Sequence, residues 1–418
     1  MKSKLAVFLI LALLAIGFVA GCGDGDGAAD GVETHTIVGL FPLTGPLATF
    51  GENSSNVAQL AAEDVNEWLE EEGKDWRLRL EIDDTQTEGP VGLRKMQSWY
   101  GEGVEFFAGP QGSGVAQECL AFANSNEILF ISPSSTSPAL AIEDDWLFRF
   151  CTDDQVQGPA IAAIAAEAGA EVIIFSWQGD TWGDGLQGAA AASMGDFGIE
   201  VYPQELRFDP QKEDFTTDAA LLDEYVTDLV EQGYALENIA VGLITFEQAA
   251  PYLAEASGYD QLHDVIWIGS DGTAASEAIL QHPTGSDFAA KVQFANPMNR
   301  PAEEVEQSNK ERVRDHIQEV LGRETDSYSY NTYDIIWALA MSIDEVGYDT
   351  NAVKEVLPRV TDEWSSVYGA SGHIVLNEAG DRAFADYDYW VLTEDKVWEI
   401  VGYYDGAAQT INWQREIY

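Results

Sequence analysis

Positively charged residues are scarce in this chain of 418 residues. Lys and Arg number 21 against 72 Asp and Glu, which gives a formal net charge of -51 at pH 7. A surface of this charge repels nucleic acid phosphates and anionic membrane surfaces, so we expect no nucleic acid partner. The acidic residues are scattered over predicted helix faces and loops. This distribution favours a solvated surface suited to a salty environment, where ions screen the repulsion.

Cysteine and histidine are also scarce, with three Cys and five His dispersed along the chain. No cluster of these residues suggests a metal site, and we expect neither a metal nor another cofactor. The DGDG run from Asp24 fails as a calcium loop, because Ala29 and His35 stand where Gly and Glu are required. Cys119 and Cys151 fall within predicted elements, so we expect buried free thiols. A disulfide between them is the alternative in an exported protein.

Motifs for catalysis are lacking. There is no Gly-x-Ser-x-Gly elbow to present a nucleophile, and no Lys follows a glycine-rich loop to hold a phosphate. Gly109, Gly112 and Gly114 have the wrong intervals for a dinucleotide fingerprint. We therefore expect that the chain is not an enzyme. An exported α/β enzyme is an alternative that rests on fold analogy alone.

Only one stretch is long and apolar, at residues 5–20, after Lys2 and Lys4. A basic start, a short apolar run and small residues before a cleavage point describe a secretory signal, and the run is short for a spanning helix. Small residues directly before Cys22 resemble the lipobox of secreted lipoproteins. We predict a signal peptide at residues 1–21, lipidation of Cys22 and a flexible tether at residues 22–33. An uncleaved membrane anchor is the alternative.

The remainder alternates strand and helix patterns in two similar halves, which predicts an α/β fold with two Rossmann-like lobes and parallel central sheets. The chain end differs, because residues 372–376, 385–392 and 397–404 alternate like antiparallel strands. The other predicted strands cover residues 36–41, 77–82, 106–108, 128–131, 147–150, 171–176, 200–206, 239–245 and 265–268.

The predicted boundaries divide each lobe between two stretches of chain. Lobe 1 takes residues 34–153 plus 300–371, and lobe 2 takes residues 154–299 plus 372–418. We place two of the crossovers near residues 152–154 and in the proline-bounded passage at 296–301. The chain then crosses between the lobes three times, and these crossings would form a hinge.

Hydroxyl-rich loops follow two neighbouring predicted strands within residues 106–140. The glycines after the first strand permit a tight turn that leaves Ser113 at a helix N-terminus, where free backbone N–H groups attract anions. Ser134 and Thr136 belong to the loop after the second strand. Ligands of open α/β sheets collect outside the carboxyl ends of the strands, so both loops should face one crevice. The alternative is that these Ser and Gly residues are only turn formers.

Three further residues lie just beyond strands in the second half: Trp182, Phe246 and Asp271. Hydroxyls with helix N–H groups can hold a carboxylate, a carboxylate can hold an ammonium, and aromatic rings can enclose an aliphatic group. A zwitterionic amino acid requires these parts. The alternatives are a turn role for Asp271 and a core role for Trp182 and Phe246.

Seven passages between about residues 34 and 404 carry a family resemblance. They are VGLFPLTGP from Val38, the predicted helix at 51–66, FAGPQGS from Phe107, ISPSSTSP from Ile131, QGP from Gln157, WGDGL from Trp182 and IGSDG from Ile268. The chain resembles the type I periplasmic-type solute-binding proteins of the leucine/isoleucine/valine-binding family, the receptors of branched-chain amino acid ABC importers. The resemblance covers nearly all of the mature chain and is specific for the fold and receptor class.

The resemblance implies how a ligand is gripped. Ser113 matches the serine that holds the ligand carboxylate, and Ser134 and Thr136 match the positions that complete this grip. Asp271 matches the acidic residue that receives the α-ammonium, although the best-known members have the longer glutamate there.

The resemblance also assigns aromatic positions. Trp182 and Phe246 match the aromatic wall of the second lobe, and Phe50 matches an aromatic residue at the cleft rim of the first. The family often has tyrosine at these places, so phenol hydroxyls are missing here. The first-lobe disulfide partners of the family are absent as well.

The resemblance predicts a receptor that closes by hinge motion on a small amino acid, branched-chain or similarly apolar. Its partner would be an ABC permease, and a lipid anchor would hold it to the outer face of the cytoplasmic membrane. Short amides, urea-like molecules or small carboxylates are alternative ligands. A ligand-binding sensor of the same fold is an alternative function.

Overall fold

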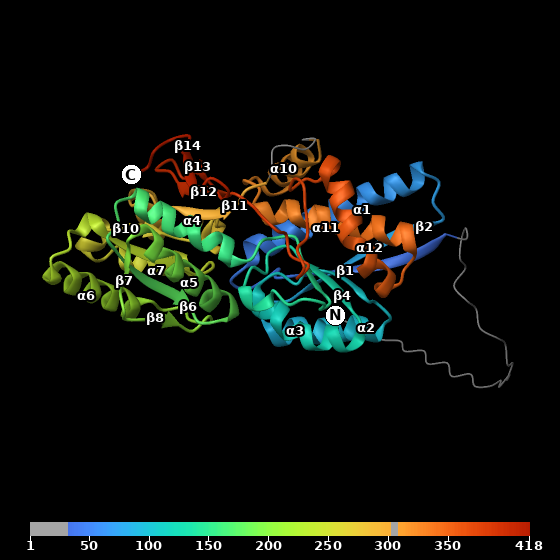
Figure 1. Ribbon diagram of the computed structural model, residues 1–418, viewed down its shortest axis with the longest axis horizontal. Helices are drawn as coiled ribbons and strands as arrows, with labels where there is room; N and C mark the ends of the chain where they lie inside the picture. Colours follow the sequence, from blue (N-terminus) through green and yellow to red (C-terminus); the bar gives the residue numbers. More distant parts are fainter. Residues whose placement is uncertain (1–31, 302–307) are drawn as a thin grey trace, which may run out of the picture.

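The computed structural model describes residues 32–301 and 308–418. The predicted signal peptide, Cys22 and most of the predicted tether lie outside the described residues. Figure 1 shows two lobes side by side, each with a sheet covered by helices. The predicted α/β class with parallel central sheets is confirmed. Within the described part of the chain, no helix combines the length and apolar character needed to cross a membrane.

The sheet of lobe 1 has five parallel strands in the order β2-β1-β3-β4-β5. Phe106 and Ala108 face one side of this sheet and Phe107 the other, which is the two-residue period of a strand buried on both faces. Helices α1, α10, α11 and α12 pack on the first side, and α2 and α3 pack on the second. The elements are β1 (Glu33–Phe41), α1 (Ala48–Glu71), β2 (Trp76–Asp84), α2 (Gly89–Gly101), β3 (Phe106–Ala108), α3 (Ser113–Asn126), β4 (Leu129–Ser132), β5 (Leu147–Arg149), α10 (Ser308–Leu321), α11 (Ser327–Val346) and α12 (Thr350–Tyr368).

The parallel sheet of lobe 2 has the order β10-β9-β6-β7, and β8 also pairs with β6. Its strands and helices share one large apolar core. The elements are α4 (Asp154–Glu167), β6 (Val172–Gln178), α5 (Thr181–Met194), β7 (Glu200–Val201), β8 (Leu206–Phe208), α6 (Thr216–Gln232), β9 (Ile239–Ile244), α7 (Ala249–Ala256), β10 (Ile266–Ile268), α8 (Glu277–Gln281) and α9 (Pro283–Lys291).

An antiparallel sheet closes lobe 2, in the order β11-β12-β13-β14. Its residues join the core of lobe 2, and Figure 1 shows it on the side of that lobe nearest α4. The strands are β11 (Asn296–Asn299), β12 (Tyr387–Leu392), β13 (Trp398–Asp405) and β14 (Thr410–Trp413). The chain leaves lobe 1 between β5 and α4, returns between β11 and α10, and leaves again between α12 and β12. The residue boundaries given above for the two lobes stay a prediction.

Two predicted elements near the lobe junction differ in part from the structure. Part of the passage predicted as a crossover at residues 296–301 forms strand β11, which tolerates Pro297 because it is an edge strand. The strand predicted at residues 372–376 is irregular apart from one bridge between Leu376 and Arg382. Its backbone is held by side chains instead: Arg382 donates to the carbonyl oxygens of Ser371 and His373.

The two described cysteines are buried and unpaired, as expected by default. Burial, with a smaller contribution from Glu118, raises the pKa of the Cys119 thiol to about 12. Burial also raises the pKa of Cys151. Both groups are therefore protonated thiols at neutral pH, with little of the thiolate character that makes cysteine reactive.

Candidate functional site

A small cavity lies between the two lobes, with a volume of about 20 Å³. The walls come from the ends of β-strands and the helices that follow them, as expected for open parallel sheets. Six of the seven residues predicted to bind a ligand line this cavity: Phe50, Ser113, Ser134, Trp182, Phe246 and Asp271.

The first wall is built on the start of α3 and the loop after β4. Ser113 is the first residue of α3, as predicted, and it follows Gly112, whose φ of 86° is a conformation that favours glycine. The Ser113 hydroxyl oxygen accepts a hydrogen bond from the backbone N–H of Ser137 at 3.1 Å. This bond joins the two hydroxyl-bearing loops into one surface.

The loop after β4 is fixed by polar contacts on both sides. Ser132 donates its hydroxyl to the carbonyl of Pro110 at 2.7 Å. Arg149 donates to the carbonyls of Ser135 and Ser137 at 2.8 and 2.9 Å. The same guanidinium makes two 2.5 Å bonds to Asp381, and both side chains are almost fully buried. The loop that carries Ser134 is therefore held from behind by a buried ion pair.

Thr136 is the predicted site residue that does not line the cavity. Its carbonyl accepts the backbone N–H of Asp154 at 2.8 Å. Its side chain is buried beside the Asp154 carboxyl and favours the charged form of that group, but no hydrogen bond of ordinary geometry joins them. Thr136 thus lies behind the wall, toward the first crossover.

The second wall is an aromatic pair. Trp182, in the first turn of α5, stacks on Phe246, which follows β9, with ring centroids 4.3 Å apart and an interplanar angle of 21°. Gly272 packs against both rings, and a Cβ there would lie 2.7 Å from Trp182 and 2.8 Å from Phe246. The pair belongs to the lobe 2 core as well as to the cavity. Trp182 and Phe246 are therefore core residues of lobe 2 and also line the cavity.

Asp271 lies at the junction of the two lobes. The Tyr328 hydroxyl donates to one carboxylate oxygen at 2.5 Å, and the Gln157 amide donates to the other at 3.0 Å. Tyr328 comes from α11 in lobe 1, so the first bond crosses the cleft. Burial raises the pKa of Asp271, and the hydrogen bonds from Tyr328 and Gln157 oppose this shift.

A second carboxylate, Asp154, is fully buried close to Asp271. Burial is the main cause of the raised pKa of Asp154, and the negative charge of Asp271 raises this pKa further. Neither Asp154 carboxylate oxygen has a hydrogen-bond partner among the described residues. Two buried carboxyl groups therefore lie together behind the cavity, and burial shifts both toward the protonated form.

Five lining residues were not predicted: Leu47, Gln111, Gly112, Tyr328 and Gly272. Tyr328 was missed because it lies in the first turn of a helix, α11, which begins at Ser327, and not in a loop after a strand. Asp326 caps this helix by accepting the N–H of Ser329 at 3.0 Å. An Asp before a helical pattern is a start signal that could have placed Tyr328 in the first turn of a helix.

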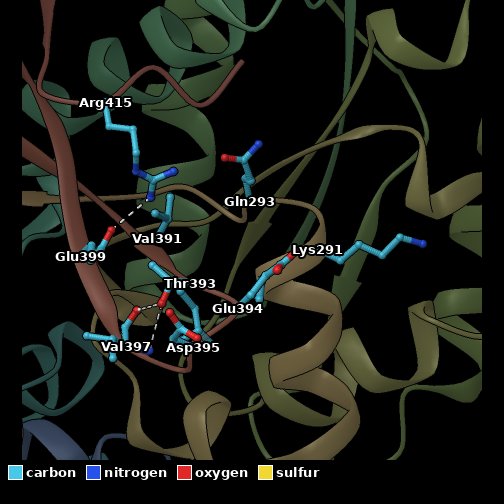
Figure 2. Close-up of a pocket in the computed structure, with 11 residues that line it drawn as sticks. Lys291, Gln293, Val391, Thr393, Glu394, Asp395, Val397, Glu399 and Arg415 are labelled. Atoms are coloured by element: carbon cyan, nitrogen blue, oxygen red, sulfur yellow. Dashed lines mark hydrogen bonds and ion pairs between the residues drawn. The ribbon is translucent and has the colours of Figure 1, made fainter.

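A larger cavity of about 410 Å³ lies away from this site, beside the β12–β13 hairpin of lobe 2 (Figure 2). Arg415 pairs with Glu399 at 3.2 Å in this cavity, and Lys291 extends away from it to contact His263 at 3.0 Å. None of the predicted site residues lines it.

Within residues 32–301 and 308–418, no group of three or more His, Cys, Asp or Glu could hold a metal ion.

Several known proteins are similar to this chain. A family model described as the receptor family ligand binding region matches residues 53–395. An uncharacterised protein of Methanocaldococcus jannaschii is 31% identical over 418 residues, covering 95% of this chain and 97% of its own. The Leu/Ile/Val-binding protein BraC3 of Rhizobium johnstonii is 25% identical over 371 residues, covering 87% of this chain and 92% of its own.

Solved structures show the same fold at lower identity. The leucine-binding protein LivK of Thermotoga maritima superposes with a TM-score of 0.73 at 19% identity, covering 88% of this chain and 98% of its own. An ABC transporter solute-binding protein of R. palustris in complex with benzoate gives 0.72 at 14% identity, covering 88% and 96%. The chain belongs to the receptor family with this ligand-binding region, as a type I periplasmic binding protein of the leucine/isoleucine/valine-binding family.

Proposed function

We propose that this protein is the extracytoplasmic receptor of an ABC importer and that it binds a small apolar amino acid between its lobes. The observation that carries the proposal is the convergence of Ser113 and Ser134 on one wall with Asp271 and an aromatic pair on the other. Hydroxyls at a helix N-terminus suit a carboxylate, and a buried carboxylate suits an ammonium. The names of the Leu/Ile/Val-binding relatives support the same ligand class.

The charge at the junction supports an ammonium over a neutral amide. The charge of Asp271 acts on the buried Asp154 carboxyl, while the nearby Arg149 is paired with Asp381. A buried charge is costly unless it is compensated. A ligand ammonium would supply the compensating positive charge, whereas an uncharged amide would leave the carboxylates to take up protons.

The size of the cavity supports a hinge motion. About 20 Å³ has room for about one water molecule, much less than an amino acid needs. Entry of a ligand therefore requires the lobes to separate. A ligand that touches both walls favours closure, because these contacts form together only when the lobes meet.

The proposal places the protein outside the cytoplasmic membrane, held by a lipid on Cys22 and docked to a permease. Globomycin treatment of expressing cells, followed by mass spectrometry, tests the anchor: blocking the lipoprotein signal peptidase should cause the uncleaved precursor to accumulate. A chain that is cleaved at another site, or retains residues 1–21 without the inhibitor, would contradict lipidation.

Substitution of Asp271 tests the ligand class by isothermal titration with L-leucine, L-isoleucine and L-valine. We expect Asp271→Ala and Asp271→Asn to lose about 2 kcal/mol or more of binding free energy, roughly 30-fold in Kd, because the ammonium loses its counter-charge. Asp287→Asn is the control, since Asp287 lies in the same lobe and its side chain is 77% exposed. Wild-type affinity in Asp271→Asn would show that the ligand is not an ammonium.

A small aromatic carboxylate is the second candidate ligand. The stacked pair of Trp182 and Phe246 offers an aromatic face, and a neighbour of the same fold was solved with benzoate. Titration with benzoate separates the two candidates. Tight benzoate binding that survives Asp271→Asn, with no binding of the three amino acids, would replace the amino acid proposal.

A further inference from the structure

Helix α1 begins at the cleft rim without a capping hydrogen bond from the side chain of its own N-cap residue. Its N-cap residue, Leu47, has no side chain that can accept a hydrogen bond. The first-turn N–H groups of a helix require acceptors from outside the helix. The N–H of Thr49 finds its acceptor in the other lobe, where Glu247 accepts it at 2.9 Å.

Glu247 contacts this helix end through three bonds. The carboxylate oxygen that accepts the Thr49 N–H also accepts the Thr49 hydroxyl at 2.6 Å. The Glu247 backbone N–H donates to the carbonyl of Pro46 at 3.2 Å. Since a helix N-terminus carries a partial positive charge, a carboxylate at this place is favoured beyond its hydrogen bonds.

Arg323 strengthens the same contact from lobe 1. It donates to the Thr49 carbonyl at 3.2 Å and to Glu52 at 2.8 Å, which ties it to the first turn of α1. Its positive charge attracts the Glu247 carboxylate across the rim. The lobe 1 side of the contact is therefore a rigid helix end with an arginine held against it.

We propose that Glu247 is a positioning residue that latches the lobes in the closed arrangement through contacts between protein atoms alone. Glu247 does not line the ligand cavity but an outer cavity of about 560 Å³, together with Thr49, Arg323 and Glu277. Its effect on ligand binding therefore comes from the balance between open and closed states. Because Glu247 directly follows Phe246, the latch and the aromatic wall move as one piece.

The inference rests on the hinge closure of the proposed function but not on the identity of the ligand. The side-chain hydrogen bonds of Glu247 go to lobe 1, although it belongs to lobe 2. A role in folding lobe 2 alone would leave the lobe arrangement unchanged when these bonds are removed. A latch predicts a change in that arrangement.

The test compares Glu247→Ala with Glu277→Ala in the full-length protein without added ligand. Glu277 lines the same outer cavity, and Glu277→Ala removes the same charge as Glu247→Ala. The Glu277 carboxylate, however, accepts its hydrogen bond from Gln281 of its own helix. We expect Glu247→Ala to raise the radius of gyration in X-ray scattering and to speed amide exchange at residues 49–52. The closed-to-open ratio should fall about tenfold, as for loss of charge-assisted hydrogen bonds. Scattering and exchange equal to those of Glu277→Ala would overturn the latch.

Thr49→Val provides an independent variant, because it removes the hydroxyl donor and keeps the backbone N–H. It should produce a smaller shift than Glu247→Ala, and the double variant should add little to Glu247→Ala. Additive effects of the two substitutions would contradict a shared contact.

Titration with L-leucine then separates the latch from the proposed function. If wild type binds leucine, Glu247→Ala should weaken binding by faster dissociation, with Glu277→Ala unchanged. If wild type binds none of the three branched-chain amino acids, the ligand class is wrong, while the scattering and exchange data still decide the latch.

Discussion

Arg149 is a fully buried arginine whose guanidinium connects the ligand-binding wall to a residue far along the chain. Its two bonds to Asp381 satisfy its charge, and its two bonds to the carbonyls of Ser135 and Ser137 fix the loop that carries Ser134. Asp381 also pairs with Arg149 through a parallel backbone bridge. The pair thus ties the site to the segment leading back toward lobe 2.

Replacing Arg149 by Met should destabilise the protein by about 3–5 kcal/mol, because Asp381 is left charged and buried without a partner. Urea unfolding followed by circular dichroism measures this loss. Arg207→Met is the matched control, since Arg207 pairs with Asp184 at 2.7 Å but both side chains are 46% exposed. Such an exposed pair contributes about 0–1 kcal/mol. Equal losses in the two variants would contradict the role assigned to burial.

Sequence reasoning located residues that directly follow strands better than residues that reach the site from the other lobe. Ser113 and Asp271 could be placed because strand ends in parallel sheets gather at one edge. Tyr328 comes from a helix of lobe 1 and meets Asp271 only through the arrangement of the lobes. Thr136 is an error of the opposite kind, because it was predicted to line the site. It lies only two positions after Ser134, but in an irregular loop this is enough to place it behind the cavity wall.

Helices α4 and α5 approach so closely in lobe 2 that their contact requires a glycine. A Cβ at Gly158 would lie 2.7 Å from the backbone carbonyl of Ala189. Backbone atoms in the middle of a helix cannot move aside as a side-chain end can. The position of α5, which carries Trp182 in its first turn, therefore depends on Gly158.

Gly158→Ala should destabilise the protein by about 1–3 kcal/mol through overpacking, and displacement of α5 should also weaken ligand binding. Gly188→Ala in α5 is the control, because a Cβ there meets nothing within 4 Å. That substitution should be neutral or stabilise by up to about 1 kcal/mol, since alanine favours helix. Thermal unfolding of both variants measures the contrast. Stabilisation by Gly158→Ala would show that the helices can separate without cost.

The elements that sequence reasoning described well are buried parallel strands with local apolar patterns, such as β3. It described poorly the elements whose hydrogen bonds depend on distant parts of the chain. Strand β11 exists because β12, about ninety positions later, pairs with it. Residues 372–376 alternate like a strand, but Arg382 and Ser365 side chains satisfy parts of this backbone.

At the scale of the whole molecule, the dominant feature is the net charge of -51. Like charges on a compact surface repel one another, and this repulsion is relieved when the chain expands. Dissolved salt screens this repulsion beyond the Debye length, which is about 3 Å at 1 M ionic strength and about 30 Å at 0.01 M. The folded state should therefore be favoured as ionic strength rises.

The melting temperature should rise by about 5 °C or more between 0.01 M and 1 M KCl, as measured by scanning calorimetry. Sucrose at matched osmolality is the control, because it leaves the charges unscreened. A melting temperature that falls or stays constant as KCl is added would contradict a folded state limited by charge repulsion.

The two buried thiols determine how the protein can be fitted with an optical reporter. Cys119 and Cys151 are buried and protonated at neutral pH, so maleimide dyes should not react with them in the native state. In the part of the chain that the structure describes, a cysteine introduced at Ser55, which lines the outer cavity, would then be the preferred point of attachment. A dye at this rim position would report each opening of the lobes as a change in brightness, which would make the receptor a sensor for its own solute.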